Sequence, residues 1–300
     1  MARSNFSLRF WGVRGSYAVS RRGALKYGGN TSCVEVLAGK HRIIFDAGTG
    51  IIGLGKELLK KKRGSLLLNL FLSHTHHDHL FGFYFFDPLF DKRNRIHIFG
   101  PGSGKRPLAE TLRAAMDPAL FPIGLDALDA KKTIWSLVGQ EHIDLRGSRQ
   151  VPTITKASNS TDDDSDEPVI LTHRSPAHPN GVMLYRVFYA DKSLVYATDI
   201  EETPGGYPDV IEFARGADIL IHDAQYLQSE YTSRTNPRKG WGHSTVESAT
   251  DVAKKAGVKR LVLFHHEPTH DDRCVDEIAK LAQRRFPATT AAAEGMVIGL

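Results

Sequence analysis

Five short apolar runs along the chain each end in a polar residue that could take part in chemistry. The runs occupy residues 42–45, 70–73, 194–198, 218–221 and 261–264, and they lead into Asp46, His74, Asp199, His222-Asp223 and His265-His266. Apolar runs of this length bounded by turn residues are typical of buried strands. Because a rigid scaffold can position reactive groups at strand ends, five such junctions predict one shared cleft.

Amphipathic helices are predicted between and after these strands. Residues 244–247 fit a capping box, apolar residues follow at helical spacing, and Gly257 marks the stop. A second amphipathic helix is expected over 271–286, followed by a closing strand near 296–298. Helices that alternate with strands in this way are expected to cover sheets.

Two further segments predict local structure of other kinds. Strands at 182–189 and 194–198 flank Asp191-Lys192, which predicts a β-hairpin. Residues 157–167 are polar and acidic with no apolar period, so we expect an exposed, mobile loop there. We find no internal repeat and no domain boundary, and therefore expect a single domain over residues 1–300.

Composition is that of an ordinary globular protein. Hydrophobic residues make up 41% of the chain and charged residues 24%, which allows a core of normal size. No apolar run reaches the roughly 18 residues needed to span a bilayer, and the N-terminus lacks a signal peptide, so a cytoplasmic protein is expected. The formal net charge of +5 mildly favours an anionic ligand.

Three features that could suggest other chemistry have plainer interpretations. Two cysteines are too few for a disulfide framework, and Cys33 lies in an apolar run typical of strand packing. The densest basic run, 60–63, precedes Gly64 and fits the last turn of a helix better than a nucleic-acid contact. The glycine-rich stretch 100–105 lacks the spacing of a phosphate-binding loop, so a plain connection is favoured.

The strongest chemical signal is the sequence at 74–79, which reads H-x-H-x-D-H. On extended chain His74 and His76 project the same way and could reach one ion, whereas Asp78 and His79 turn towards a second. Nitrogen and oxygen donors together suit zinc and tolerate manganese or iron. The motif follows a predicted buried strand and precedes an apolar segment at 80–83, expected to be a packed helix, which favours a metal site over an exposed histidine-rich loop.

With its neighbours, this motif resembles the metallo-β-lactamase-fold hydrolases over nearly the whole chain. The matching pieces are Asp46 in F-D-A-G, the histidine motif, His178, Asp199 in A-T-D, and His265. Within that superfamily, 222–225 is similar to the H-E-A-T and 242–245 to the H-S-T of the ribonuclease Z and cyclic-phosphodiesterase branch. The resemblance implies an α/β fold, a four-layer αββα sandwich of two mixed β-sheets flanked by helices.

The family pattern implies two divalent metal ions, with zinc favoured. One ion would be held by His74, His76 and His178, the other by Asp78, His79 and His265, and Asp199 would bridge them. Asp46 would orient a ligand histidine. Two alternatives stay open, because His173 could replace His178 and His266 could replace His265.

A bridging aspartate also bears on the reaction. The resemblance implies that phosphodiesterases and thioesterases have one, whereas β-lactam-hydrolysing members usually lack it. Two ions about 3.5–4 Å apart can share a hydroxide nucleophile. The catalytic residues would be Asp78, also a ligand, His243, which would protonate the leaving oxygen, and Asp223, which would orient His243. Asp223 stands where the branch has Glu, whose side chain is one methylene longer.

We therefore expect a dinuclear phosphodiesterase acting on a small cyclic or linear phosphodiester. The alternatives are a thioester or lactone hydrolase resembling glyoxalase II, and a non-catalytic metal-binding sensor. Transfer-RNA-processing relatives carry a long basic arm, whereas the longest candidate insertion here is the acidic 157–167, so nucleic acid is not favoured as substrate. Arg14 and Asn30 are expected to contact an anionic substrate. No membrane partner is expected, and a homodimer stays open.

Overall fold

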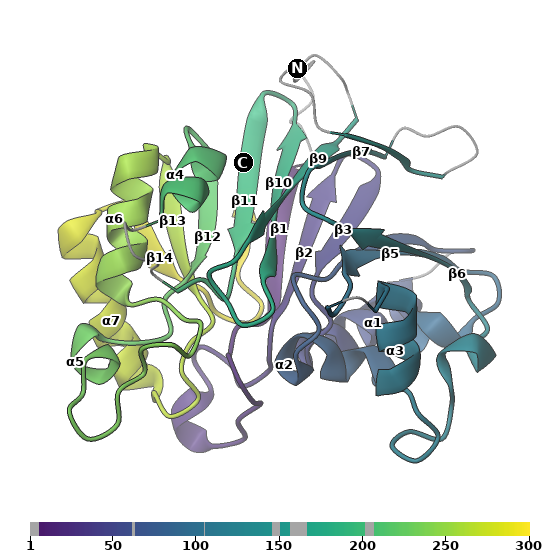
Figure 1. The fold of residues 1–300 in the computed structure, drawn as a ribbon, viewed down its shortest axis with the longest axis horizontal. Coiled ribbons are helices and arrows are strands. Elements are labelled where there is room, and N and C mark those ends of the chain that lie inside the picture. The colour runs from purple at the N-terminus through teal and green to yellow at the C-terminus, as the bar shows by residue number, and fades with distance from the viewer. Residues whose placement is uncertain (1–5, 62–63, 105, 146–150, 157–166, 202–206) are drawn as a thin grey trace.

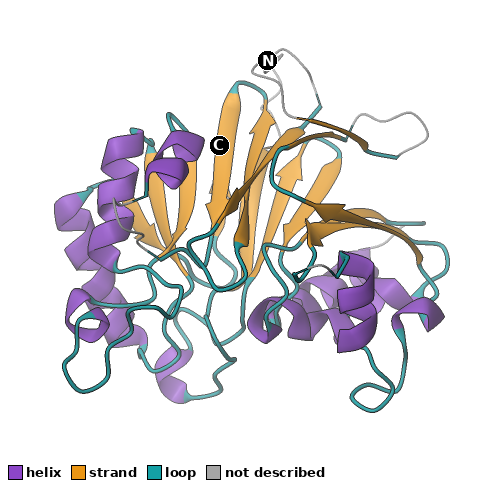
Figure 2. Cartoon of the chain, viewed as in Figure 1, coloured by secondary structure: helices purple, strands orange, loops and turns teal. Residues whose placement is uncertain are grey.

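The computed structural model describes residues 6–61, 64–104, 106–145, 151–156, 167–201 and 207–300. Two mixed β-sheets lie face to face, and helices flank them on the two outer sides (Figures 1 and 2). This arrangement confirms the predicted αββα sandwich.

The first sheet has strand order β15-β1-β2-β3-β4-β5-β6. Its strands are β1 (Phe6–Gly12), β2 (Cys33–Ala38), β3 (His41–Phe45), β4 (Leu67–Phe71), β5 (Arg95–Pro101), β6 (Lys131–Leu137) and β15 (Val297–Gly299). β3 to β6 run parallel, so their carboxyl ends lie at one edge of the sheet. The outer layer contains α1 (Gly50–Lys61), α2 (His77–Leu80), α3 (Leu108–Ala115) and the 3-10 helices η2 (Phe81–Phe85), η3 (Asp87–Phe90) and η4 (Leu125–Ala127). One more 3-10 helix, η1 (Arg22–Ala24), follows β1.

The second sheet has strand order β14-β13-β12-β11-β10-β9-β7-β8. Its strands are β7 (Glu141–Asp144), β8 (Thr153–Lys156), β9 (Val169–Ser175), β10 (Val182–Tyr189), β11 (Lys192–Ala197), β12 (Ile219–Asp223), β13 (Arg260–Phe264) and β14 (Thr289–Ala291). β11 to β14 run parallel, and α4 (Pro208–Ala214), α6 (Val246–Ala256) and α7 (Asp272–Arg285) pack in the layer outside them (Figure 1). The short α5 (Gln228–Tyr231) follows β12.

Stacked aromatic rings fill the space between the two sheets. Phe45 lies 4.9 Å from Tyr196 and Phe71 lies 4.4 Å from Phe99, measured between ring centroids. Such pairs add a directional preference to the burial of large apolar area. The hydroxyl of the buried Tyr196 donates to Asp46, so this core also fixes a residue at the edge of the sheets.

Local expectations are mostly confirmed, with small shifts in register. β10 and β11 form the predicted hairpin, but its turn is at Ala190-Asp191, both with positive φ, and Lys192 already belongs to β11. The cap of α6 is Thr245, which accepts from the backbone N–H of Ser248, rather than Ser244. Ser244 instead donates its hydroxyl to the carbonyl of Ile200, so it is no longer available for the predicted capping box.

The remaining local expectations concern a cysteine, a basic run, a short helix and an acidic loop. Cys33 is buried in β2, and Lys60 and Lys61 lie in the last turn of α1, as predicted. The predicted packed helix over 80–83 is divided between the end of α2 and η2. The acidic loop predicted at 157–167 lies outside the described residues except for Glu167. None of the helices in the described part of the chain is both long and apolar enough to cross a membrane.

Candidate metal centre

The polar residues named above gather where parallel strands of both sheets end. Asp46 follows β3, Asp199 lies two residues after β11, and His265 follows β13. All three have positive φ, 60° for Asp46, 54° for Asp199 and 62° for His265. Left-handed backbone is uncommon outside glycine, and such strain persists where surrounding contacts enforce it, often at functional sites. The chain therefore turns sharply at each of these strand ends, inside the cluster of polar side chains.

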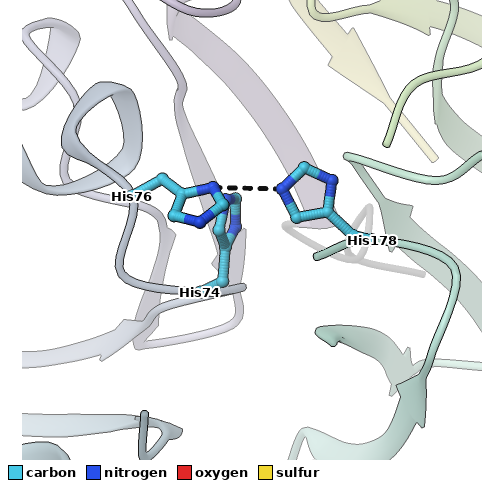
Figure 3. Close-up of side chains that lie close together, drawn as sticks. All are labelled: His74, His76 and His178. Atoms are coloured by element: carbon cyan, nitrogen blue, oxygen red, sulfur yellow. Dashed lines mark hydrogen bonds between the residues drawn. The ribbon is translucent and has the colours of Figure 1, made fainter. Parts of the chain in front are cut away.

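Three imidazoles converge to form the first cluster, His74, His76 and His178 (Figure 3). His76 Nδ1 lies 3.0 Å from His178 Nε2. His74 and His178 are buried, and His74 Nε2 has no hydrogen-bond partner. A buried ring nitrogen without a partner is costly unless something is bound there.

Hydrogen bonds at the far side of two rings define which nitrogen carries the lone pair. His178 Nδ1 donates to the carbonyl of Gly242 at 2.9 Å. His74 Nδ1 lies 3.1 Å from Ser73 Oγ, which already donates its proton to Asp46 and therefore accepts here. Both Nε2 atoms are thus free to donate a lone pair into the cluster. Burial lowers the pKa of His74, His76 and His178, which favours the neutral ring that a metal requires.

A second cluster joins Asp78, His79, Asp199 and His265. His79 Nδ1 donates to Asp46 Oδ2 at 2.8 Å, and His265 Nδ1 donates to Gln225 Oε1 at 2.8 Å. Their Nε2 atoms, only 3.2 Å apart, both carry lone pairs in these tautomers. Two lone pairs at this distance repel unless a proton or a metal cation lies between them.

Electrostatics in the second cluster favour a cation. Burial opposes a charge on His79, but Asp199, Asp78 and Asp46 raise the pKa of its ring well above the ordinary value. Burial likewise opposes ionisation of Asp78, yet the neighbouring His79 and His265 hold the pKa of its carboxyl well below the usual range. The group therefore retains its negative carboxylates and attracts positive charge.

The interatomic distances fit divalent cations. Two ligands about 2.0–2.1 Å from a tetrahedral ion lie about 3.3 Å from each other. His265 Nε2 lies 3.1 Å from Asp78 Oδ2, and His79 Nε2 lies 3.3 Å from the same oxygen. Asp199 faces both clusters, because its Oδ1 lies 3.2 Å from His79 Nε2 and its Oδ2 lies 3.8 Å from His74 Nε2. These residues can hold two ions with one shared carboxylate.

His243 and Asp223 lie beside the second cluster. His243 Nδ1 donates to Asp223 Oδ2 at 2.8 Å, and the His243 ring stacks on that of His265 at 4.9 Å. Burial would lower the pKa of His243, but Asp223 raises it to about 9. His243 Nδ1 also lies 3.8 Å from Asp199, and with Asp223 and His265 the four residues form a third potential ligand group.

The two histidine alternatives differ clearly in their surroundings. His173 Nε2 lies 3.3 Å from Asp209. In the described part of the chain it is His178, and not His173, that belongs to the cluster with His74 and His76. His266 Nε2 donates to the carbonyl of Ala292, whereas the adjacent His265 reaches the second cluster. His265 and His266 differ in this way because the side chains of successive residues point in opposite directions.

Arg14 and Asn30, which were expected to contact substrate, both form hydrogen bonds within the protein. Arg14 is fully buried, and its guanidinium donates to the carbonyls of Gly28, Glu267 and His270. This placement contradicts a substrate contact, because the side chain is committed to holding loops together. Asn30 donates its amide to Glu294, and a contact with substrate stays a prediction for it.

Several residues that position the site were not singled out from the sequence. Gln225 accepts from His265 and donates to Glu267, and the backbone N–H of Ser16 donates to Asp78 at 2.7 Å. Glu201 accepts from the backbone N–H groups of Gly240 and Gly242. Only Gln225 had a signal, as the last residue of the H-D-A-Q motif. Contacts through backbone N–H groups leave no trace in residue type.

Gly242 offers a test of how tightly His178 is held. A Cβ on Gly242, whose φ is +87°, would lie 2.1 Å from His178 Nδ1. Gly242→Ala should displace this ring and weaken metal binding at the first cluster by at least about 10–100-fold, the loss typical of disturbed support around a ligand. Isothermal titration of the metal-free protein with Zn²⁺ measures it.

Gly240→Ala is the matched control. Its φ of +89° imposes the same backbone strain, but nothing lies within 4 Å of the added Cβ. Both variants should share the loss of stability that comes from backbone strain, whereas only Gly242→Ala should lose metal affinity. Equal zinc affinities in the two variants would contradict the placement of His178 against Gly242.

Comparisons with known proteins agree with this geometry. The model of the family described as "Beta-lactamase superfamily domain" matches residues 41–266. The ribonuclease Z of Myxococcus xanthus is 26% identical over 267 residues, covering 81% of this chain and 83% of that protein.

Solved structures of similar proteins extend the likeness to the whole fold. The metallo-beta-lactamase fold protein YhfI from Bacillus subtilis superposes with a TM-score of 0.67 at 17% identity, covering 99% of both chains. A diphosphatase from the PhnP family gives a TM-score of 0.63 at 15% identity, covering 98% of both chains. At these identities the likeness shows the shared fold.

Proposed function

The chain belongs to the beta-lactamase superfamily domain family and is a metal-dependent hydrolase, and on that premise we propose that it cleaves a small cyclic or linear phosphodiester with two bound metal ions. The observation that carries the proposal is the His243–Asp223 pair next to a double ligand cluster. A phosphodiester needs both features, because negative charge builds on the phosphate while an alkoxide leaves. A thioester hydrolase needs the ligands but has less use for an oriented imidazole, because a thiolate leaves readily without a proton.

The ligands would be divided as the two clusters suggest. His74, His76 and His178 would hold one ion and Asp78, His79 and His265 the other, with one oxygen of Asp199 towards each. When bound, the ions would supply Lewis acidity, which neutralises phosphate oxygens and lowers the pKa of a nucleophilic water. Asp46 would keep the lone pair of His79 directed inward by accepting from its Nδ1.

His243 would act on the leaving group. The Nδ1–H group of His243 donates a hydrogen bond to Asp223. The second proton of the charged ring is therefore on Nε2, and it can pass to the leaving oxygen as the P–O bond breaks. Asp223 would stabilise that charged ring and fix its orientation. Positive charge from bound ions would lower the pKa of His243 from the value of about 9 that Asp223 produces, towards the range useful for proton transfer.

A small substrate is preferred over a folded RNA. The M. xanthus relative is named ribonuclease Z, which supports phosphodiester chemistry as a class. However, the longest candidate insertion in the sequence, 157–167, is acidic and would repel a phosphate backbone. The PhnP-family neighbour is called a diphosphatase, which is in keeping with a small phosphorylated substrate.

The proposal is tested by a substrate screen on zinc- and manganese-loaded protein. Bis(4-nitrophenyl) phosphate, 2′,3′- and 3′,5′-cyclic nucleotides and dinucleotides should be hydrolysed, while a thioester, a lactone and a β-lactam should not. Preferred turnover of the thioester or lactone would replace the proposal with the thioesterase alternative. No turnover with any substrate, together with tight metal binding, would indicate a sensor.

Metal stoichiometry gives a separate prediction. We expect two divalent ions per fully loaded chain, because the clusters offer seven ligand residues, more than one tetrahedral ion can use. Elemental analysis after reconstitution with excess zinc or manganese measures this number. One ion per chain under both conditions would contradict a dinuclear site.

A further inference from the structure

The segment that leads into Gly242 and His243 has a distinctive charge and position. Residues 232–241 include Arg234, Arg238 and Lys239 and no acidic residue. Two residues beyond the end of this segment lies His243, and Gly242 between them accepts from His178. The segment therefore carries positive charge and leads directly into the two residues that contact the clusters.

Hydrogen bonds hold this segment in place. Glu201 accepts from the backbone N–H groups of Gly240 and Gly242 and from the hydroxyl of Tyr231. The backbone N–H of Trp241 donates to the carbonyl of Arg238 at 3.2 Å. A surface fixed in this way can bind a ligand with little ordering cost.

Trp241 is the most unusual residue of the segment. Its side chain is 51% exposed, while the other two indoles of the chain are committed elsewhere. Trp11 donates its Nε1–H to Glu35, and Trp135 stacks on Phe99 at 4.7 Å. Within the described part of the chain, the one group recorded over the Trp241 ring is the guanidinium of Arg238, 4.4 Å from its centroid.

Arg238 connects this indole to the catalytic side of the site. Its guanidinium also lies 5.7 Å from the ring of Tyr226, which in turn lies 6.0 Å from that of His243. Glu230 is close enough to interact electrostatically with Arg238, but its nearest ion-pair partner is His270 at 2.7 Å. The sequence of groups from the site outward is thus His243, Tyr226, Arg238 and Trp241.

We propose that Trp241, held by Arg238, is a stacking surface for the nucleobase of the leaving nucleoside, so that the substrate is a nucleotide phosphodiester. This inference rests on the proposed phosphodiesterase function. Every nucleobase has a π-face that stacks on an aromatic side chain, and arginine beside the ring adds attraction to both the base and the phosphate. An alkyl phosphodiester would leave this surface unused.

Trp241→Leu tests the proposal through a pair of substrates. One is a dinucleoside monophosphate with two adenines, and the other is the same compound with both bases absent. Loss of one stacking contact should raise KM for the base-bearing compound about tenfold, with kcat changed much less. KM for the abasic compound should change less than twofold, and Trp241→Phe should restore most of the loss.

Phe85→Leu is the matched control, because Phe85 is also an exposed aromatic residue, at 43%, but belongs to η2 after the histidine motif. It should leave the ratio of the two KM values unchanged. Equal increases for both substrates in Trp241→Leu, or no increase for either, would overturn the proposal.

A binding experiment separates failure of this inference from failure of the proposed function. Adenosine monophosphate should bind the metal-free wild type more tightly than ribose 5-phosphate does, and Trp241→Leu should reduce that difference about tenfold. Calorimetry measures both without turnover. If the base-bearing and the abasic compound are both left uncleaved, but adenosine monophosphate still binds more tightly than ribose 5-phosphate, the stacking surface stands and the phosphodiesterase proposal fails. Equal affinity of the wild type for the two ligands would overturn the stacking surface.

Discussion

Asp199→Ala should lower turnover by more than about 10³-fold, beyond the loss typical of a single preorganised electrostatic contact. The reason is that its two oxygens face different clusters, Oδ1 towards His79 and His265 and Oδ2 towards His74 and His178. If Asp199 bridges two ions as proposed, removing the carboxylate would take away a ligand and a compensating charge from both at once. Metal content should fall below two ions per chain by elemental analysis.

The backbone at Asp199 calls for controls. Its φ is 54°, a conformation that Asp tolerates better than alanine, so Asp199→Ala also adds backbone strain. Asp199→Asn tolerates this conformation better and removes the charge with little change of shape. Asp191→Ala imposes similar strain at an exposed hairpin residue with φ 59° and should leave metal content and turnover unchanged. Normal metal content and turnover in Asp199→Asn would rule out the bridging role.

Much of this arrangement follows from local pattern. Each of the five apolar runs overlaps a strand, because its length and its bounding turn residues leave few alternatives, although β4 already ends at Phe71 within the run 70–73. The spacing of 74–79 places His74 and His76 in one cluster and Asp78 and His79 in the other. A side-chain period of two on extended chain and the turn that follows account for this division.

The remaining features depend on parts of the chain that are far apart in sequence. Arg14 was expected to contact an anionic substrate because its loop resembles family segments near the cleft mouth, but its guanidinium contacts carbonyls about 250 residues further along the chain, at Glu267 and His270. Ser244 was expected as a helix cap, but the carbonyl of Ile200 competes for its hydroxyl. Local propensity gives no information about such distant acceptors.

The second large effect on turnover is expected from substitution of His243. Its position allows two roles, as a metal ligand or as a proton donor. It lies within a potential ligand group with Asp199, Asp223 and His265, so removing it could in principle release a metal. However, its Nδ1 is committed to Asp223 at 2.8 Å, and the other two clusters are complete without it. His243→Ala should therefore keep two metals, with the exposed His77→Ala as a control that belongs to no potential ligand group of the described residues.

Turnover is the measurement that assigns the role. General acid catalysis is worth about 10²–10⁴ in rate, so His243→Ala should lower kcat by that factor for a cyclic nucleotide, whose alkoxide leaves poorly without a proton. The loss should shrink greatly for bis(4-nitrophenyl) phosphate, because nitrophenolate is stable as an anion. Asp223→Asn should show the same dependence on leaving group with a smaller loss, since the ring remains but loses its charged partner. Equal losses for the two substrates, or a metal missing from His243→Ala, would show that this histidine is a ligand or a structural residue rather than the proton donor.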